Sequence, residues 1–214
     1  MESDTVMKKI FAIGDIHGCL SHLNKLLDQF TLGQDDTLLF LGDYIDRGPD
    51  SYEVVETILS LRSKQAKVIC LKGNHEQMYL DCLQGTDQGL FLSNGGNQTL
   101  RSYKKNGWKY PSPEHMEFFL SLDLYYETED YIFVHAGLRP NVPLKDQDPE
   151  DMLWIRGQFY ASPNTWNKTI VFGHTPFPEP YVRDGKIGID TGACMGGVLT
   201  CVELPGMIFY QATG

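Results

Sequence analysis

Residues 36–48 read DTLLFLGDYIDRG, an apolar run that stops at Gly42 and is followed at once by acidic and basic residues. An apolar run of this length, closed by a glycine, predicts a short β-strand. Gly42 lets the chain turn sharply after the strand. The polar residues that follow Gly42 should therefore lie in a loop at the carboxyl end of this strand.

Apolar runs followed by polar residues recur elsewhere in the chain. In the first half, helical patterns separate these runs, and an alternation of strand and helix predicts parallel strands joined by crossover helices. In the second half, Asp184-Gly185 and Pro205-Gly206 are hairpin turn signals. We therefore predict an α/β sandwich. The other apolar runs, each followed by a side chain that can bind a metal ion, are KKIFAIG (8–14) before Asp15, KVICLKG (67–73) before Asn74, YIFV (131–134) before His135 and TIVFG (169–173) before His174.

Composition narrows the class of protein. The chain of 214 residues suits a single domain spanning residues 1–214. We expect a cytoplasmic protein without a membrane partner, because the sequence has no signal-peptide pattern and no apolar run near the ~20 residues that cross a bilayer. The net charge of −10 argues against a nucleic-acid partner. The five cysteines form no CxxC pair, which predicts reduced thiols.

The polar residues after the strands carry the chemistry. Open α/β sheets place ligands at the carboxyl ends of their strands, so these side chains should meet in one crevice. Asp15 and His17 are two residues apart, and in an extended chain they point the same way, which suits two ligands of one cation. Asp43 and Asp46 are three apart, so the first could bind metal while the second turns to another partner.

Carboxylate, imidazole and amide groups without a thiolate suit divalent Mn, Fe or Zn. Two such ions about 3.5–4 Å apart clamp a phosphoryl group and lower the pKa of a water molecule between them. The residues therefore predict a metal-dependent phosphoesterase. Asn74 and His75 are adjacent and should face different ways, with different tasks.

The motifs resemble those of the phosphoprotein phosphatase family, which belongs to the calcineurin-like metallophosphoesterases. They occur in the family's order and extend over residues 14–175, and DTGACMGGVLT at 190–200 resembles a C-terminal segment of the bacterial members. The resemblance implies a central β-sandwich flanked by helices, with a binuclear metal centre at its edge. The motifs are GDIHG (14–18), GDYIDRG (42–48), GNHE (73–76), HAG (135–137) and GHT (173–175).

The resemblance also implies a role for each site residue. Two divalent ions, with manganese expected and iron or zinc as alternatives, would activate a bridging hydroxide for in-line attack on phosphorus. Asn94, in FLSNGG, resembles a loop residue near the phosphate. The implied set is Asp15 and His17 on the first metal, Asn74, His135 and His174 on the second, Asp43 bridging both, His75 as proton donor held by Asp46, and Arg47 and Arg156 on the phosphate oxygens.

The substrate is the open question at this level. The resemblance favours a serine/threonine protein phosphatase of the small bacterial and bacteriophage type, acting on a phosphorylated protein or a small phosphoester. The symmetrical diadenosine tetraphosphate hydrolase shares the ending DTGxxxGGxLT, but it usually lacks the acid at the place of Asp46 and reads GNHD, whereas this chain has Glu76. A non-catalytic metal- or phosphopeptide-binding module is a third alternative, against which the set of His75, Asp46 and Arg47 argues. The oligomeric state cannot be read from the sequence.

Overall fold

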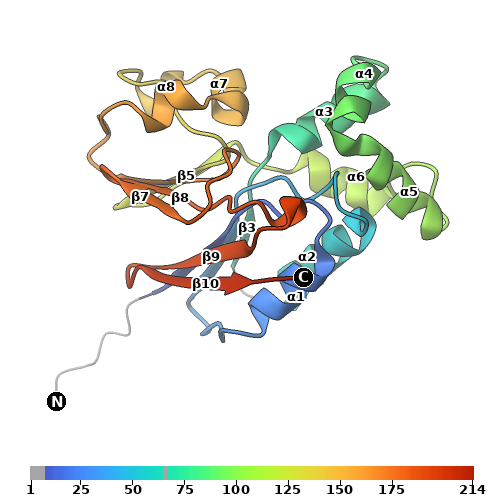
Figure 1. Cartoon of the computed structure of the whole chain (residues 1–214), viewed down its shortest axis with the longest axis horizontal. Helices are drawn as coiled ribbons and strands as arrows, with labels where there is room; N and C mark the ends of the chain where they lie inside the picture. Colours follow the sequence, from blue (N-terminus) through green and yellow to red (C-terminus); the bar gives the residue numbers. More distant parts are fainter. Residues whose placement is uncertain (1–7, 65–66) are drawn as a thin grey trace.

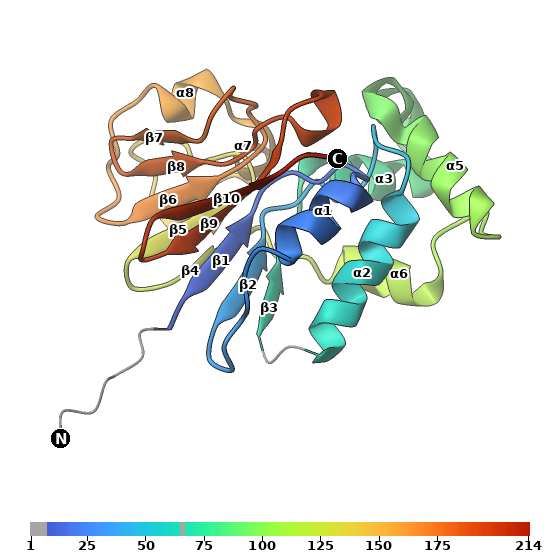
Figure 2. The ribbon, with the colours of Figure 1, turned by 60° about the horizontal axis from the view of Figure 1, so that its bottom comes forward.

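The computed structural model describes residues 8–64 and 67–214, in which two five-stranded mixed sheets face each other (Figure 1). In the second view α1 (Leu20–Leu27) and α2 (Ser51–Lys64) lie beside the strands of the N-terminal part of the chain (Figure 2). In spatial order the first sheet contains β10 (Ile208–Ala212), β9 (Leu199–Leu204), β1 (Ile10–Ile13), β2 (Thr37–Phe40) and β3 (Val68–Cys70). The second contains β4 (Tyr125–Glu127), β5 (Tyr131–Val134), β6 (Thr169–Phe172), β8 (Lys186–Gly188) and β7 (Tyr181–Arg183).

Each sheet has a parallel centre. Strands β1, β2 and β3 are parallel and are joined through α1 (Leu20–Leu27) and α2 (Ser51–Lys64), as the sequence predicted. Strands β5, β6 and β8 are parallel in the second sheet. The two predicted hairpins, β7–β8 and β9–β10, are confirmed. Asp184 and Gly185 both have positive φ, which is the conformation that a tight hairpin turn requires.

Alternate residues of the strands enter different cores, so the apolar runs are explained by burial on both faces. In β1, Phe11 and Ile13 pack against the helices, whereas Ala12 faces the second sheet. In β5, Phe133 faces the first sheet, while Ile132 and Val134, on either side of it, pack outward. The fold therefore has four layers, with α3 (Asn74–Leu83) and α6 (Pro113–Leu120) beside α1 and α2 on one side, and α7 (Pro149–Trp154) and α8 (Gly157–Tyr160) on the other.

A helical arm made of α4 (Gln88–Phe91), η1 (Leu92–Gly96) and α5 (Asn97–Lys105) stands next to α3 at the right of Figure 1. Its π-helical turn brings the Gly95 carbonyl to the backbone N–H of Arg47, at 3.3 Å. Gly95 has φ +100°, and a Cβ there would lie 2.9 Å from the Arg47 backbone nitrogen. A glycine is thus required for the arm to approach the loop after β2 so closely.

Helix α2 begins at Ser51, directly after Asp50. In its first turn the Glu53 carboxylate accepts hydrogen bonds from Ser102 and Lys105 of α5 and from Asn106, the residue that follows α5. Among the described residues, no helix has the length and apolar character needed to cross a membrane.

Candidate active site

The carboxyl ends of six parallel strands, three from each sheet, meet at one edge of the sandwich. Contacts between the sheets show this directly, because the backbone N–H of His174 donates to the Asp15 carboxylate at 3.0 Å and His135 Nδ1 donates to the Leu41 carbonyl at 2.9 Å. All of the side chains gathered there are at most 6% exposed, and they are Asp15, His17, Asp43, Asn74, His75, His135, His174 and Asp190.

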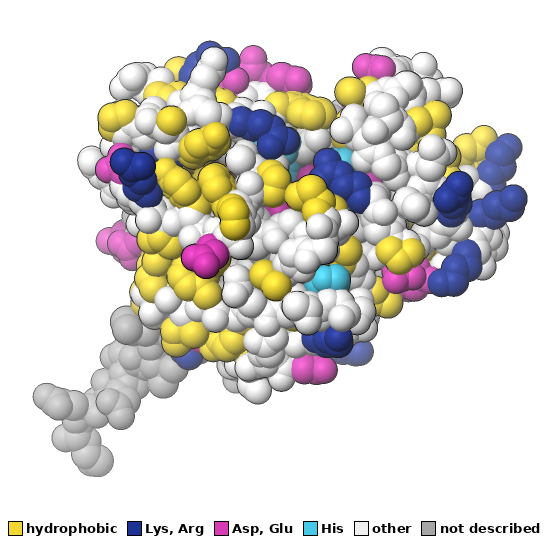
Figure 3. All heavy atoms as spheres, viewed as in Figure 1, with side chains coloured by type: hydrophobic (Ala, Val, Ile, Leu, Met, Phe, Trp, Pro, Cys, Tyr) yellow, Lys and Arg dark blue, Asp and Glu magenta, His cyan; other side chains and the backbone are white. Residues whose placement is uncertain are grey.

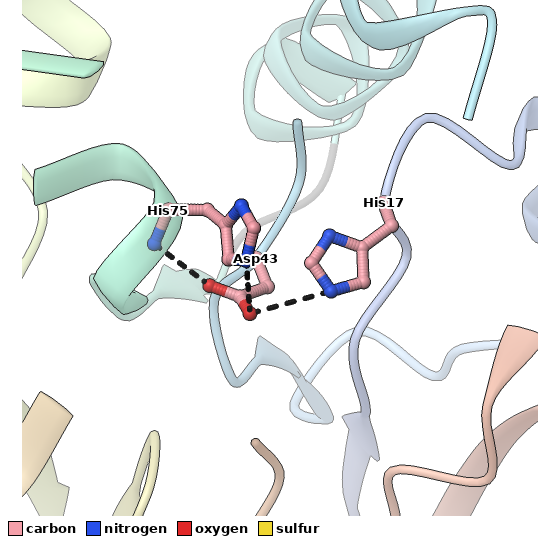
Figure 4. A group of neighbouring side chains, drawn as sticks. All are labelled: His17, Asp43 and His75. Atoms are coloured by element: carbon pink, nitrogen blue, oxygen red, sulfur yellow. Dashed lines mark hydrogen bonds and ion pairs between the residues drawn. The ribbon is translucent and has the colours of Figure 1, made fainter. Parts of the chain in front are cut away.

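One group, called here the His17 cluster, consists of His17, Asp43 and His75. Figure 4 shows both imidazole rings directed toward the Asp43 carboxylate, one from the loop after β1 and one from the start of α3. His17 Nδ1 donates to the Ile45 carbonyl at 2.9 Å, which leaves the lone pair on Nε2, 3.4 Å from Asp43 Oδ2. The backbone N–H of His75 donates to Asp43 Oδ1 at 3.1 Å.

A second group, the His135 cluster, consists of Asn74, His135 and His174 together with Asp43. Since His135 Nδ1 donates to Leu41, its Nε2 carries a lone pair, yet it lies 3.0 Å from Asn74 Oδ1 and 3.4 Å from Asp43 Oδ1. His174 Nδ1 lies 3.1 Å from the same Asn74 oxygen. Acceptor atoms therefore point at one another in a buried space, an arrangement that a cation between them would stabilise.

The electrostatics agree with that interpretation. Burial, followed by the charges of Asp190 and Asp43, raises the pKa of Asp15 well above its usual value, and burial and Glu76 raise the pKa of Asp43. Burial lowers the pKa of His135 to about 3, so this imidazole is neutral and can donate its lone pair. The two clusters share Asp43, and the ligand atoms of its carboxylate and of the two histidines in each cluster lie within 4.8 Å of one another. The donor set therefore fits a binuclear metal site, without fixing which metal binds.

Asp46 and His75 form a buried pair beside the His17 cluster. His75 Nδ1 lies 2.6 Å from Asp46 Oδ2, and both side chains have no exposed surface. Burial raises the pKa of Asp46 to about 7 and lowers the pKa of His75 to about 3. Near neutral pH the Asp46 carboxyl group is therefore partly protonated and the His75 ring is neutral. Within residues 8–64 and 67–214, His75 Nε2 has no hydrogen-bond partner, and it faces Asp43 at 3.9 Å, so it can serve a ligand.

Two exposed arginines flank the buried clusters. Arg47 Nη1 contacts His17 Nε2 at 2.8 Å, and its charge adds to burial in lowering the pKa of His75. Arg156 precedes α8, and its charge contributes, after burial and His135, to the lowered pKa of His174. Figure 3 shows histidine and acidic atoms in a hollow between basic side chains. The centre therefore combines buried anionic ligands with positive charge at its rim.

Two residues that the structure places at or beside the site were not singled out from the sequence. Glu76, read there only as a letter of a motif, is fully buried and accepts the backbone N–H groups of Gly73, Asp43 and Tyr44 at 2.9–3.0 Å. Its spacing from Gly73 is that of a capping box, which was the available signal. Asp190 follows the apolar run of β8, so it ends a sixth strand by the same pattern that identified the other five.

Asn94 lies in η1 near the loop of Arg47, but its amide group donates to the Leu90 carbonyl at 2.9 Å. The contact with Arg47 is made by the next residue, Gly95, through its backbone. The structure thus brings Asn94 to the arm beside the site, with its side chain engaged inside the arm.

Neutral imidazoles and buried carboxylates around a shared Asp43, with arginines at the rim, define a metal-dependent phosphoesterase. The chain belongs to the calcineurin-like phosphoesterases, because the sequence profile of that family matches residues 8–194. The four-layer arrangement of two mixed sheets and flanking helices is the fold of this family, as the sequence predicted. The protein is therefore a phosphoesterase hydrolase.

Curated relatives divide between two activities. A bis(5'-nucleosyl)-tetraphosphatase PrpE [asymmetrical] of Oceanobacillus iheyensis is 31% identical, over 92% of this chain and 89% of its own. Serine/threonine-protein phosphatase 1 of Salmonella typhimurium is 29% identical, over 92% of both chains. Among solved structures, a candidate diadenosine tetraphosphatase has a TM-score of 0.78 at 24% identity, covering 98% of this chain and 95% of its own. These similarities support the reaction class and leave the substrate undetermined.

Proposed function

We propose that this protein is a metal-dependent serine/threonine protein phosphatase. The observation that carries the proposal is the buried pair of Asp46 and His75, whose free Nε2 faces the shared ligand Asp43. A pair placed in this way can supply a proton to the oxygen that leaves phosphorus, and general acids of this kind accelerate reactions by about 10²–10⁴-fold.

The metal ligands that the sequence motifs predict lie in the two clusters and beside them. Asp15 and His17 would hold one divalent cation, Asn74, His135 and His174 would hold the other, and Asp43 would bridge them. When bound, the cations would supply Lewis acidity that neutralises phosphate charge and acidifies a water. Manganese, iron and zinc all suit this oxygen and nitrogen donor set.

The remaining residues would position the phosphate and deliver the proton. Arg47 and Arg156 would bind its oxygens from opposite sides, because a guanidinium group matches phosphate geometry. As water adds to phosphorus, the bond to the alcohol oxygen breaks, and that oxygen would take the proton from His75 Nε2. Asp46 would hold the ring by its other nitrogen and stabilise the charge that the ring carries.

The need for a proton donor favours an alcohol as the leaving group. A serine or threonine alkoxide is a strong base that departs poorly without protonation, whereas the nucleoside phosphate released from a dinucleoside tetraphosphate departs as a stable anion. An acid catalyst therefore matters more for a phosphomonoester of a protein side chain. The similarity to the Salmonella phosphatase over 92% of both chains supports this assignment.

Hydrolysis of a dinucleoside tetraphosphate is the second candidate, because several relatives with 28–31% identity carry that name. Their names specify asymmetrical cleavage, whereas the sequence motifs had suggested the symmetrical hydrolase as the alternative. The products separate the two reactions, since asymmetrical cleavage of diadenosine tetraphosphate yields ATP and AMP and symmetrical cleavage yields ADP alone.

The test uses protein stripped of metal and then supplied with Mn²⁺. Release of phosphate from a phosphoserine peptide is compared with cleavage of diadenosine tetraphosphate, with His75→Asn as the control that keeps the ligands. Manganese-dependent release from the peptide, greatly reduced in His75→Asn, would support the proposal. Cleavage of the dinucleotide alone would overturn the substrate assignment, and inactivity on both with metal bound would favour the non-catalytic binding module.

A further inference from the structure

Thr99, at the third position of α5, contacts the Asp46–His75 pair although it belongs to none of the sequence motifs. Its hydroxyl donates to Asp46 Oδ1 at 2.5 Å and accepts the backbone N–H of Asp46 at 2.9 Å. The side chain is fully buried. Thr99 therefore occupies one carboxylate oxygen of Asp46 and leaves the other, Oδ2, for His75 at 2.6 Å.

Asp46 needs such support because its backbone is in a strained conformation. Its φ is +70° and that of Arg47 is +64°, a region that residues with a Cβ rarely adopt. Ser51 also accepts the Asp46 N–H, at 3.1 Å, and lies 3.2 Å from the Thr99 hydroxyl. Ser51 thus contacts the Asp46 backbone and the Thr99 hydroxyl without reaching the carboxylate, whereas Thr99 contacts both the backbone and the carboxylate of Asp46.

We propose that Thr99 is a positioning residue for proton donation, and that through it the helical arm sets how well the enzyme expels poor leaving groups. The proposal rests on the proposed function of the Asp46–His75 pair. Without the Thr99 hydroxyl, Asp46 Oδ1 loses its donor and the carboxylate can rotate, which moves the His75 ring away from the leaving oxygen. The phosphate ligands and the metal ligands are left in place.

The experiment compares Thr99→Val, which has nearly the same shape, with Thr99→Ser, which keeps the hydroxyl, and with Ser51→Ala as the matched control. Each variant is assayed with Mn²⁺ on two esters. Phenyl phosphate releases phenolate, a poor leaving group that benefits from a proton donor, whereas 2,4-dinitrophenyl phosphate releases a stable phenolate that needs no proton. Thr99→Val should lose about tenfold or more in kcat on phenyl phosphate and less than about threefold on the dinitrophenyl ester. Thr99→Ser and Ser51→Ala should keep the wild-type ratio of the two rates.

A structural role alone would give equal losses on both esters in Thr99→Val, and that result would overturn the proposal while the proposed function stands. If wild-type protein hydrolyses neither ester, the proposed function fails instead. Proton NMR supplies a readout that needs no turnover, since the low-field signal of the proton between His75 and Asp46 should shift in Thr99→Val and stay in Ser51→Ala. An unchanged signal in Thr99→Val would contradict the proposal. If Thr99→Val does not fold, Thr99→Cys replaces it, because a thiol is only a weak hydrogen-bond donor.

Discussion

The His17 cluster and the His135 cluster share Asp43 but are held by different kinds of contact. In the His135 cluster, His135 is oriented by a backbone carbonyl and its ligand nitrogen faces an amide oxygen. In the His17 cluster, His75 is oriented by the Asp46 carboxylate and has a free nitrogen. Backbone contacts hold a neutral ligand, whereas a carboxylate partner prepares a ring to exchange protons. The His135 cluster is therefore suited to binding alone, whereas the His17 cluster combines a ring held by the Ile45 carbonyl, His17, with a ring prepared for proton transfer, His75.

The largest effect should come from Asp43, the residue that belongs to both clusters. Asp43→Asn should lower kcat/KM by about 10³-fold or more, because the charge that attracts both cations is lost. Without metal the variant should be at least as stable as wild type, since burial and Glu76 already disfavour the Asp43 carboxylate. Metal content and thermal unfolding with and without Mn²⁺ measure both effects. A variant that keeps two tightly bound ions would contradict the bridging assignment.

The division of tasks is tested by His75→Asn against His135→Asn. His75→Asn should lose about 10²-fold or more in kcat while keeping its metal, because only the proton donor is removed. His135→Asn should lose metal affinity, by about 10–100-fold or more, since a ligand is weakened. Metal content by atomic spectroscopy and kcat at saturating Mn²⁺ give the comparison. Equal metal loss in both variants would mean that His75 is itself a ligand.

A smaller effect is expected from Glu76, which holds the loop after β2, where Asp43 lies, in place. Glu76→Gln replaces one accepting oxygen by an NH₂ group that opposes the backbone N–H groups, and it should cost about 1–3 kcal/mol in the free energy of unfolding. For a chain of this size that corresponds to a fall in Tm of about 2–4 °C for each kcal/mol. Calorimetry measures the change, and Glu76→Asp tests whether length as well as charge matters. A Tm unchanged in Glu76→Gln would show that the hydrogen bonds from Glu76 to the loop are not needed for stability.

The smallest effect should come from Arg156, at the exposed rim near the His135 cluster. Arg156→Ala should raise the inhibition constant of inorganic phosphate about tenfold, the size of one hydrogen bond from a charged donor. Arg47→Ala should have the larger effect, because Arg47 also contacts His17. Inhibition by phosphate at fixed Mn²⁺ provides the measurement. If Arg156→Ala lowered the affinity for phosphate more than Arg47→Ala does, the phosphate would lie nearer the His135 cluster.

The sequence alone predicted the strands and the polar residues that end them, because both are local signals. Five apolar runs closed by Asp, Asn or His identified most of the side chains that gather at the site. Asp190 was missed although β8 ends in the same way, and Glu76 was missed because its role is to bind the backbone of a loop 30 or so residues earlier. The individual ligand roles stay predictions until metal is measured.

Local pattern and motif order thus determined the fold class, the reaction class and most of the residues that form the centre. Only the tertiary structure decided how the strands divide between two sheets, and which distant residues meet. Asp15 and His174 are 159 positions apart and Thr99 is 53 from Asp46, yet both pairs are in hydrogen-bond contact. The pattern of apolar and polar residues along the sequence does not predict such pairs, because they depend on how the helical arm and the two sheets pack. Packing across long sequence separations is the physical reason that the support of the proton donor could be seen only in the folded molecule.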